Sequence, residues 1–261
     1  MTNRELETIL KNEQFYIFGT GFVSEMLWRG IEQKGLEANV LGFLVSDPER
    51  KAVFHGRPVL GLTDTNAEEG TKIIVAVHET VYRDIDLGNK NVIWIYPYLY
   101  GFLYGNHTEE KLMTLNEIRN NQPDDQYWIA ARYAAIEGIE KRDAYLKSLY
   151  TRAMMIHSSK DTAEKRLVSF ERILMNVRES GFDSSKAIDI TDRFEVIDGL
   201  HRLAMAAYFN IEQINCRVYR HSDIYDKVLG PANRLPERIL RENSFTEEDI
   251  AVLKAFKEIC G

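Results

Sequence analysis

The hydrophobic pattern divides the chain into a strand-rich first part and a helix-rich second part. Up to residue 98, short β-favouring apolar runs alternate with polar and helical stretches, and these runs lie at 14–18, 40–45, 58–62, 72–77 and 91–96. The segment 22–34, between the first two runs, is predicted to be a helix that ends at Gly35. Strands that alternate with helices form parallel sheets. We therefore expect residues 1–98 to form an α/β domain around a parallel, doubly wound sheet.

The rest of the chain is predicted to contain more helix. Apolar residues recur at helical intervals over 126–157 and 162–180. Residues 99–125 contain several Gly and Asn residues and end in Gln-Pro-Asp-Asp, which predicts a connector. Residues 126–261 then form a second, helix-rich α+β domain with flanking helices.

A strand–turn–helix–strand pattern lies within this second domain. The apolar run 194–197 ends at Asp198 and Gly199, a pair that is typical of turns. Over residues 200–208, apolar positions recur at i, i+3, i+4, i+7 and i+8, which is one face of a helix. A second β-favouring run follows at 214–219. The pattern predicts a tight turn that leads directly into a helix.

The residues of this turn predict a phosphate site. His201 and Arg202 lie in the first helical turn, where backbone N–H groups without helical partners and the helix dipole favour an anion. The guanidinium of Arg202 matches phosphate oxygens, and Gly199 lets the backbone approach a ligand. Asp198 is placed to hold a magnesium ion or to accept a proton, so Asp198 and His201 are the candidate catalytic residues. In the alternative interpretation, Asp198 and Gly199 only make a turn, and His201 and Arg202 are a solvated helix start.

A second glycine turn follows the first predicted strand. Gly19, Gly21 and Ser24 form a GxGxxS sequence at the start of the helix 22–34, and two glycines permit a tight turn and the approach of a pyrophosphate. Asp47 follows the second strand, about where such a domain places the acid that binds a ribose hydroxyl. These residues predict a dinucleotide or nucleotide-sugar site. A domain that has kept this turn but binds no ligand is the alternative.

Charge and composition narrow the possible partners. The net charge of −7 argues against non-specific nucleic-acid binding, which needs a basic surface. The polar N-terminus predicts no signal peptide, and no apolar run approaches the ~20 residues that span a bilayer. Cys216 and Cys260 form no metal or redox motif, and Cys216 is predicted to be a buried small hydrophobe. We expect a cytoplasmic protein without membrane association.

The stretch from Arg166 to Arg220 resembles the ParB/sulfiredoxin (ParB-like nuclease) superfamily. The resemblance rests on the strand that ends in Ile-Asp, on the turn with Gly199, His201 and Arg202, and on the alanine-rich helix that follows. It implies that a nucleotide's phosphates bind at this turn. Sulfiredoxins carry a cysteine just before the histidine, whereas this chain has Leu200, so sulfinic-acid reduction is not implied. No helix-turn-helix of the ParB type is recognisable after the matched stretch.

The first domain is similar to the Rossmann-like nucleotide-sugar-binding domain of bacterial sugar acetyltransferases. The sequences GTGFVSEML, VLGFLVSD, GRPVLGL and IIVAVHETVYRDI carry this similarity. It implies that Gly19, Gly21 and Asp47 contact a nucleotide sugar. The hexapeptide repeat that transfers acetyl groups in that family is missing, so acetyl transfer is not implied.

Three functional hypotheses follow, and the sequence does not decide whether the chain is an enzyme. In the first, a nucleoside di- or triphosphate binds with magnesium at the second domain, and a small-molecule phosphotransferase acts in surface-polysaccharide biosynthesis. A nucleotide sugar or NAD would then bind at the first domain. In the second, the chain is a non-catalytic module that responds to a nucleotide. A ParB-type DNA-binding regulator ranks third, because the net charge has the wrong sign.

Overall fold

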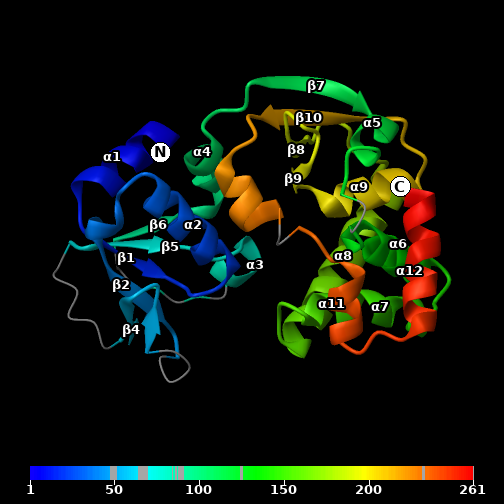
Figure 1. Cartoon of the computed structure of the whole chain (residues 1–261), viewed down its shortest axis with the longest axis horizontal. Helices are drawn as coiled ribbons and strands as arrows, with labels where there is room; N and C mark the ends of the chain where they lie inside the picture. The colour runs from blue at the N-terminus through cyan, green and yellow to red at the C-terminus, as the bar shows by residue number, and fades with distance from the viewer. Residues whose placement is uncertain are drawn as a thin grey trace. The chain divides into compact units, whose positions relative to one another are not determined.

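The chain folds into two compact units. The computed structural model describes residues 1–47, 52–63, 70–83, 85, 87, 91–123, 126–230 and 233–260. The first unit is Met1–Asn106 and the second is His107–Gly261 (Figure 1). Both are mixtures of helices and strands, which confirms the α/β class predicted for the chain.

The first unit contains a six-stranded sheet. Its order is β3 (Val53–Phe54), β4 (Arg57–Gly61), β2 (Val40–Val45), β1 (Phe15–Phe18), β5 (Lys72–Val75), β6 (Val92–Trp94). All neighbours from β4 to β6 are parallel, whereas β3 and β4 are antiparallel. The chain runs outward from β1 through β2 to β4 and then returns to β5 on the other side of β1. The strand order therefore reverses between β1 and β5, where doubly wound sheets bind their ligands.

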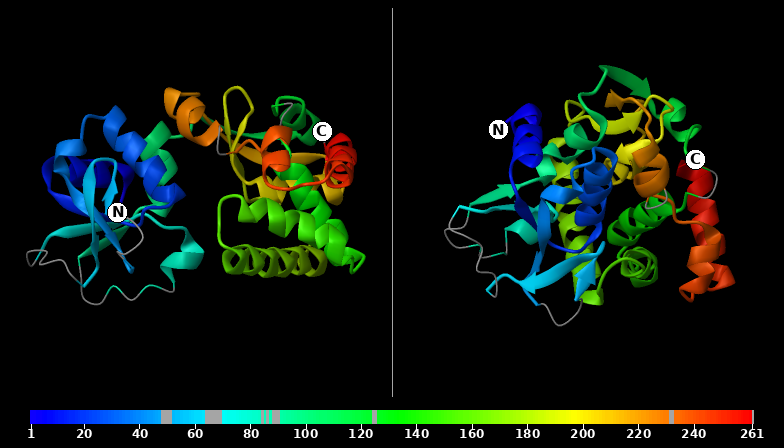
Figure 2. Two further views of the ribbon diagram at one scale, coloured as in Figure 1. Left: turned by 60° about the horizontal axis from the view of Figure 1, so that its bottom comes forward. Right: turned by 60° about the vertical axis from the view of Figure 1, so that its left-hand side comes forward.

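Helices cover the sheet of the first unit. They are α1 (Asn3–Asn12), α2 (Phe22–Gln33), η1 (Glu37–Asn39), α3 (Glu79–Tyr82), η3 (Tyr96–Tyr98) and α4 (Leu99–Tyr104). Figure 2 shows α1, α2 and α4 gathered on one face of the sheet. On the other face, Tyr82 and Ile85 pack against Phe18, Leu44 and Val75. Each strand alternates its side chains between these two faces, so both faces are apolar.

The second unit contains a four-stranded sheet with helices on one face. The order is β7 (Glu109–Thr114), β10 (Gln213–Tyr219), β8 (Ile188–Thr191), β9 (Val196–Asp198). β10 is parallel to β8 and antiparallel to β7, and β9 is antiparallel to β8. Ile188, Ile190, Ile214, Cys216 and Val218 point into the helical core and are buried. The predicted burial of Cys216 is thus confirmed.

Helix α6 forms the centre of the second unit. The helices are α5 (Leu115–Arg119), α6 (Trp128–Glu140), α7 (Ala144–Met155), α8 (Lys160–Ser180), α9 (Leu200–Tyr208), the π-helix η4 (Tyr225–Leu229), α11 (Glu237–Glu242) and α12 (Glu247–Cys260). α6 packs against α7, α8, α9 and α12. Ten of its thirteen residues are buried, so it lacks a polar face. Arg132 is one of these ten.

Two sequence expectations need correction. The predicted connector 99–125 contains α4, β7 and α5, and β7 pairs along β10 as an edge strand of the second sheet. Its polar alternation resembles that of a loop because one face of this edge strand is solvated. The helical stretch 126–157 is two helices, because Arg142 has a positive φ of 56° and Asp143 caps α7.

The described helices include none that is long and apolar enough to cross a membrane.

Candidate functional site

The turn between β9 and α9 requires glycine. Gly199 has φ +108° and ψ 17°, which is a left-handed conformation. A Cβ at this position would lie 2.5 Å from Cγ2 of Ile188, so both the backbone angle and the packing exclude a side chain. The N–H of Gly199 donates to Oδ1 of the exposed Asp198 at 2.7 Å. The predicted sharp entry into the helix is therefore present.

His201 turns toward the helices of the second unit. Its Nε2 lies 3.2 Å from the hydroxyl of Tyr150 on α7, and its ring lies 4.6 Å from that of Phe170 on α8, measured between centroids. The histidine is half-buried. His201 is therefore not part of a solvated helix start, because side chains of α7 and α8 contact its ring.

Arg202 is held by the loop between α8 and β8. Its Nη2 donates to the backbone oxygen of Asp183 at 2.6 Å, and the guanidinium lies 4.7 Å from the ring centroid of Phe182. Its Nε is buried and has no hydrogen-bond partner among the described residues. Burial lowers the pKa of Arg202, which the carboxylate of Asp183 offsets in part. The predicted phosphate fork is thus partly engaged by the protein itself.

A second arginine, Arg132 of α6, also lies near the turn. Its exposed fraction is 8%, its Nη1 donates to the backbone oxygen of Trp128 at 2.9 Å, and its Nε has no hydrogen-bond partner in the described chain. Burial lowers the pKa of Arg132 to about 10. The charge of Arg166 acts in the same direction, and Tyr150 and Asp198 act in the opposite one.

These side chains form a basic cluster beside the turn, made of Arg132, Tyr150, Arg166 and His201. Arg132 and Arg166 both lower the pKa of the Tyr150 phenol, although burial outweighs them and raises it overall. Burial, and to a smaller extent the charge of Arg166, also lower the pKa of His157. Within the described residues, neither arginine forms a direct ion pair with a carboxylate, and Asp198 acts on Arg132 only from a longer distance. A buried guanidinium without a carboxylate is costly, and an anion would remove that cost.

Arg132, Tyr150 and Arg166 were not predicted from the sequence. Arg132 lies within the apolar pattern of α6, where a single charged residue interrupts the sequence WIAARYAAI. That interruption was the available signal, because a charged residue is almost never fully buried without a partner. Tyr150 and Arg166 gave no signal, because their role depends on how α7 and α8 pack against α9.

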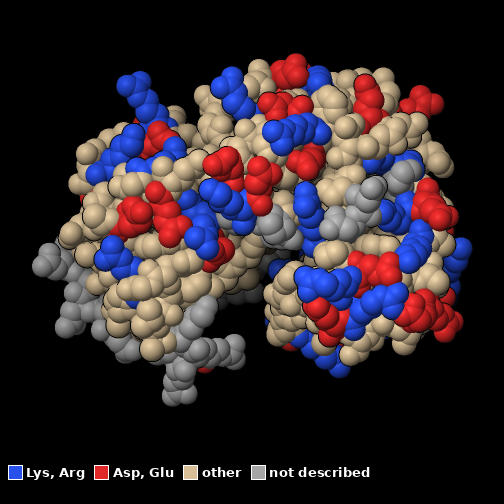
Figure 3. All heavy atoms as spheres, in the orientation of Figure 1, with Lys and Arg blue, Asp and Glu red and all other residues tan. Residues whose placement is uncertain are grey.

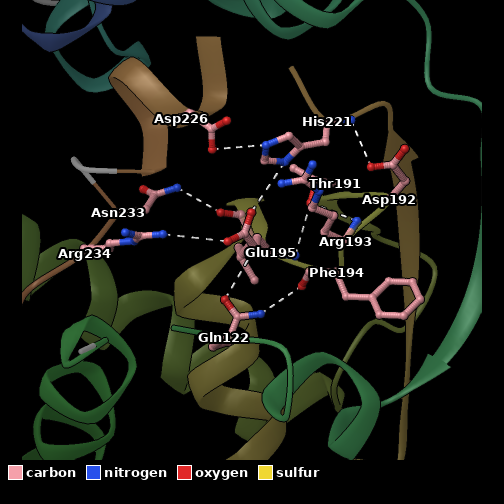
Figure 4. Close-up of polar contacts among 11 residues, drawn as sticks. Gln122, Thr191, Asp192, Arg193, Phe194, Glu195, His221, Asp226, Asn233 and Arg234 are labelled. Atoms are coloured by element: carbon pink, nitrogen blue, oxygen red, sulfur yellow. Dashed lines mark hydrogen bonds and ion pairs between the residues drawn. The ribbon is translucent and has the colours of Figure 1, made fainter. Parts of the chain in front are cut away.

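A different polar cluster lies at the opposite end of β9. Figure 4 shows Glu195 pointing toward His221 and Arg234, with Asp226 on the other side of the imidazole ring. Oε2 of Glu195 lies 3.5 Å from Nδ1 of His221, and Asp226 Oδ1 lies 3.1 Å from Nε2. The backbone N–H of His221 donates to Asp192 at 3.0 Å. Glu195 and Asp192 therefore pair with this histidine at the end of the strand that is remote from Gly199.

The predicted site of the first unit lies where the strand order reverses. Gly19 follows β1 with φ +111°, and a Cβ there would lie 3.0 Å from the backbone oxygen of Ala76. Gly21 is the N-cap of α2 and has open space where a Cβ would point. The buried Ser24 hydroxyl donates to the same Ala76 oxygen at 3.1 Å and so fixes α2 beside β5. The exposed Asp47 follows β2, so the parallel strands bring it to the same edge as the glycines.

Comparisons with protein-family models, with curated proteins and with solved structures find no match to this chain.

Proposed function

We propose that this chain is a nucleotide-binding protein in which the second unit binds the phosphates of a nucleoside triphosphate and transfers the terminal phosphoryl group to a small molecule. The phosphates would lie between the N-terminus of α9, whose first N–H groups lack helical partners, and the basic cluster. The resemblance of this turn to the ParB/sulfiredoxin superfamily supports the same placement. The proposal extends to a role in surface-polysaccharide biosynthesis through the nucleotide-sugar resemblance of the first unit.

The observation that carries the proposal is the buried Arg132, which forms no direct ion pair with a carboxylate among the described residues. A positive charge at 8% exposure, with a second arginine nearby, costs several kcal/mol by the general scale of ion burial. A structural role would be served equally by an apolar residue of similar volume. An anion with several oxygens would offset the free energy of burying this charge. The left-handed Gly199 starts α9, whose first backbone N–H groups would bind the same anion.

The residues present fit a magnesium ion that arrives with the nucleotide. No group of three or more His, Cys, Asp or Glu side chains among the described residues could hold a metal ion. Magnesium commonly binds through one or two carboxylates together with substrate phosphates. The exposed Asp198 supplies one carboxylate at the turn itself. When bound, the ion would neutralise phosphate charge, while this chain's own residues orient the phosphates.

The first unit is proposed to bind a nucleotide sugar or NAD. The support is the uncapped N-terminus of α2 at Gly21, the close approach at Gly19, and Asp47 at the same sheet edge. The competing proposal for the whole chain is a non-catalytic module that binds the same nucleotides without turnover. Basic and acidic side chains alternate on the face of the second unit in Figure 3, which favours either proposal over a DNA-binding regulator.

Calorimetric titration tests these proposals. ATP, ADP, CTP, UDP-glucose and NAD are titrated with magnesium into the wild type, into Arg132→Met and into Gly21→Asp. We expect Arg132→Met to weaken ATP or CTP binding at least tenfold, because one charge-assisted phosphate contact is lost. Gly21→Asp places a carboxylate at the N-cap of α2 and should abolish only nucleotide-sugar or NAD binding.

The matched control is Arg178→Met on α8, an arginine that is 53% exposed and pairs with Glu140 at 3.1 Å. It makes the same chemical change away from the turn and should leave every affinity within twofold. Release of phosphate or ADP over time separates an enzyme from a non-catalytic module. If no nucleotide binds the wild type, both site proposals are wrong.

A further inference from the structure

A row of charged residues crosses the sheet of the second unit and ends at the phosphate turn. Glu110 of β7 is the register partner of Arg217 of β10, Arg217 is the partner of Asp189 of β8, and Asp189 is the partner of Asp198 of β9. Neighbouring strands lie about 4.8 Å apart, so the row is about 14 Å long. Its residues point away from the helical core, since Cys216 and Ile188, which precede Arg217 and Asp189, point into it.

The middle of the row is a tight ion pair. Arg217 donates from Nε and Nη2 to the two oxygens of Asp189 at 2.6 and 2.9 Å. Asp189 is 4% exposed, and burial raises its pKa to about 6, with Asp198 adding to the shift and Arg217 opposing it. The pair fixes the Arg217 guanidinium, which is partly exposed on its outer side.

A polar groove lies over the outer half of this row. Its volume is about 420 Å³, and its walls are Glu110, Ser185, Lys186, Ala187, Asn215 and Arg217. The charges of the walls are largely balanced, because Arg217 pairs with Asp189 and Lys186 lies 3.7 Å from Asp183. The walls contain both donors and acceptors, which suits hydroxyl groups that both donate and accept.

We propose that this groove binds the acceptor of the phosphoryl group, a neutral polyhydroxy compound of the sugar or polyol class. The inference rests on the proposed phosphotransferase function of the adjacent turn. A strongly charged acceptor is disfavoured, because the balanced walls would leave its charge without a partner. The volume exceeds the lower end of small-molecule pockets, about 300 Å³.

The row gives the acceptor a path to the phosphates. An acceptor that lies over Arg217 and extends along the row toward β9 would bring one hydroxyl toward Asp198 beside Gly199. The hydroxyl oxygen forms a bond to the terminal phosphorus, the bond from that phosphorus to the bridging oxygen breaks, and the nucleoside diphosphate leaves with that oxygen. The hydroxyl proton passes to a solvent water at the exposed turn. Arg217 lines the groove and would contact the acceptor, and the buried Asp189 is a positioning residue, since it acts by fixing Arg217.

The test uses the full chain with ATP, magnesium and two sets of probes. The neutral set is glucose, N-acetylglucosamine, glycerol and myo-inositol, and the charged set is glutamate, lysine and citrate. ADP release is measured with each probe in the wild type and in Ala187→Trp, whose indole fills the groove. Glu179→Trp, an exposed position of α8 outside the groove, is the matched control.

We expect at least one neutral probe to raise ADP release tenfold or more in the wild type. Ala187→Trp should lower kcat/KM for that probe at least tenfold and leave the ATP Kd within twofold, whereas Glu179→Trp changes neither. If the ATP Kd of Ala187→Trp also rises, Asn215→Leu is used instead, because it removes hydrogen bonds without adding bulk.

Three results would overturn the inference. One is ATP binding without stimulation by any neutral probe, which leaves the nucleotide site standing. Another is stimulation by the charged probes alone, or stimulation that survives filling of the groove. The third is the absence of ATP binding in the wild type, which removes the proposed function together with the inference.

Discussion

Replacing Arg132 with methionine should stabilise the ligand-free protein while it weakens phosphate binding. Methionine has a similar length, fills the same space in α6 and carries no charge. Most substitutions in a protein core destabilise it, so a gain in stability is an unusual expectation. It follows from the buried charge of Arg132, which forms no direct ion pair with a described carboxylate and which Asp198 stabilises only from a longer distance.

The size of the effect comes from the pKa. Burial lowers the pKa of Arg132 from its ordinary value to about 10, and each pKa unit corresponds to about 1.4 kcal/mol. The charged side chain therefore costs the folded state about 3 kcal/mol at neutral pH. The folded pKa is the lower one, so this cost is complete below pH 10 and disappears as the pH rises toward the unfolded value. The lost hydrogen bond to Trp128 and the cation–π contact with its ring offset about 1–2 kcal/mol.

The net gain is about 1–2 kcal/mol, which corresponds to a Tm increase of about 2–8 °C for a unit of this size. Differential scanning calorimetry of the full chain, without nucleotide and with saturating ATP and magnesium, measures both effects. The Arg178→Met control should change the unfolding free energy by less than about 1 kcal/mol, as expected for an exposed pair. A loss of more than about 1 kcal/mol in Arg132→Met, with ATP still stabilising it as in the wild type, would refute the reasoning.

Three other outcomes can be measured independently. Gly19→Ala should lower the unfolding free energy in urea by about 1–3 kcal/mol, because Gly19 has a φ of +111° and the new Cβ would lie 3.0 Å from the backbone oxygen of Ala76. Gly21→Ala, which has open space where its Cβ would point, should lower it by less than about 1 kcal/mol. Cys216 is fully buried and burial raises its pKa to about 12, so in a Cys260→Ser variant Ellman's reagent at pH 8 should react only after unfolding. Burial raises the pKa of Asp189 to about 6, so the folded protein holds this proton more tightly and the contribution of Asp189 to stability falls as the pH rises from about 4 to 6. Relative to Asp189→Asn, the unfolding free energy of the wild type in urea should fall by up to about 3 kcal/mol between pH 4 and pH 7. A difference that stays constant with pH would contradict this effect of burial.

The first unit was largely predictable from the sequence because its signals are local. Period-two and period-3.6 patterns, interrupted by glycine, mark strands and helices directly, and the predicted strand 40–45 is β2 as observed. The predicted helix 22–34 is α2 to within one residue. The turn at Gly199 was also predictable, since Asp-Gly followed by a change of period is typical of a strand that turns directly into a helix.

The basic cluster was not predictable from the sequence. Arg132, Tyr150 and His201 are brought together by three helices that are distant in the sequence, and their spacing along the chain has no pattern. The edge strand β7 was missed for a related reason. Its pairing with β10 spans about a hundred residues, and its alternation of Glu, Lys and Thr with Leu and Met resembles a polar loop.

The two units differ in what they reveal about a ligand. In the first unit, Gly19 and Ser24 build a close approach of helix and sheet, and a sheet without a ligand would benefit from that packing as well. In the second unit, burying Arg132 near Arg166 lowers stability and brings no packing that methionine could not supply. A chain under selection for folding alone would lose such a charge quickly, because stabilising substitutions are easy to find. The second unit is therefore the stronger candidate for the functional centre, and the nucleotide affinity of Arg132→Met is the measurement on which that ranking depends.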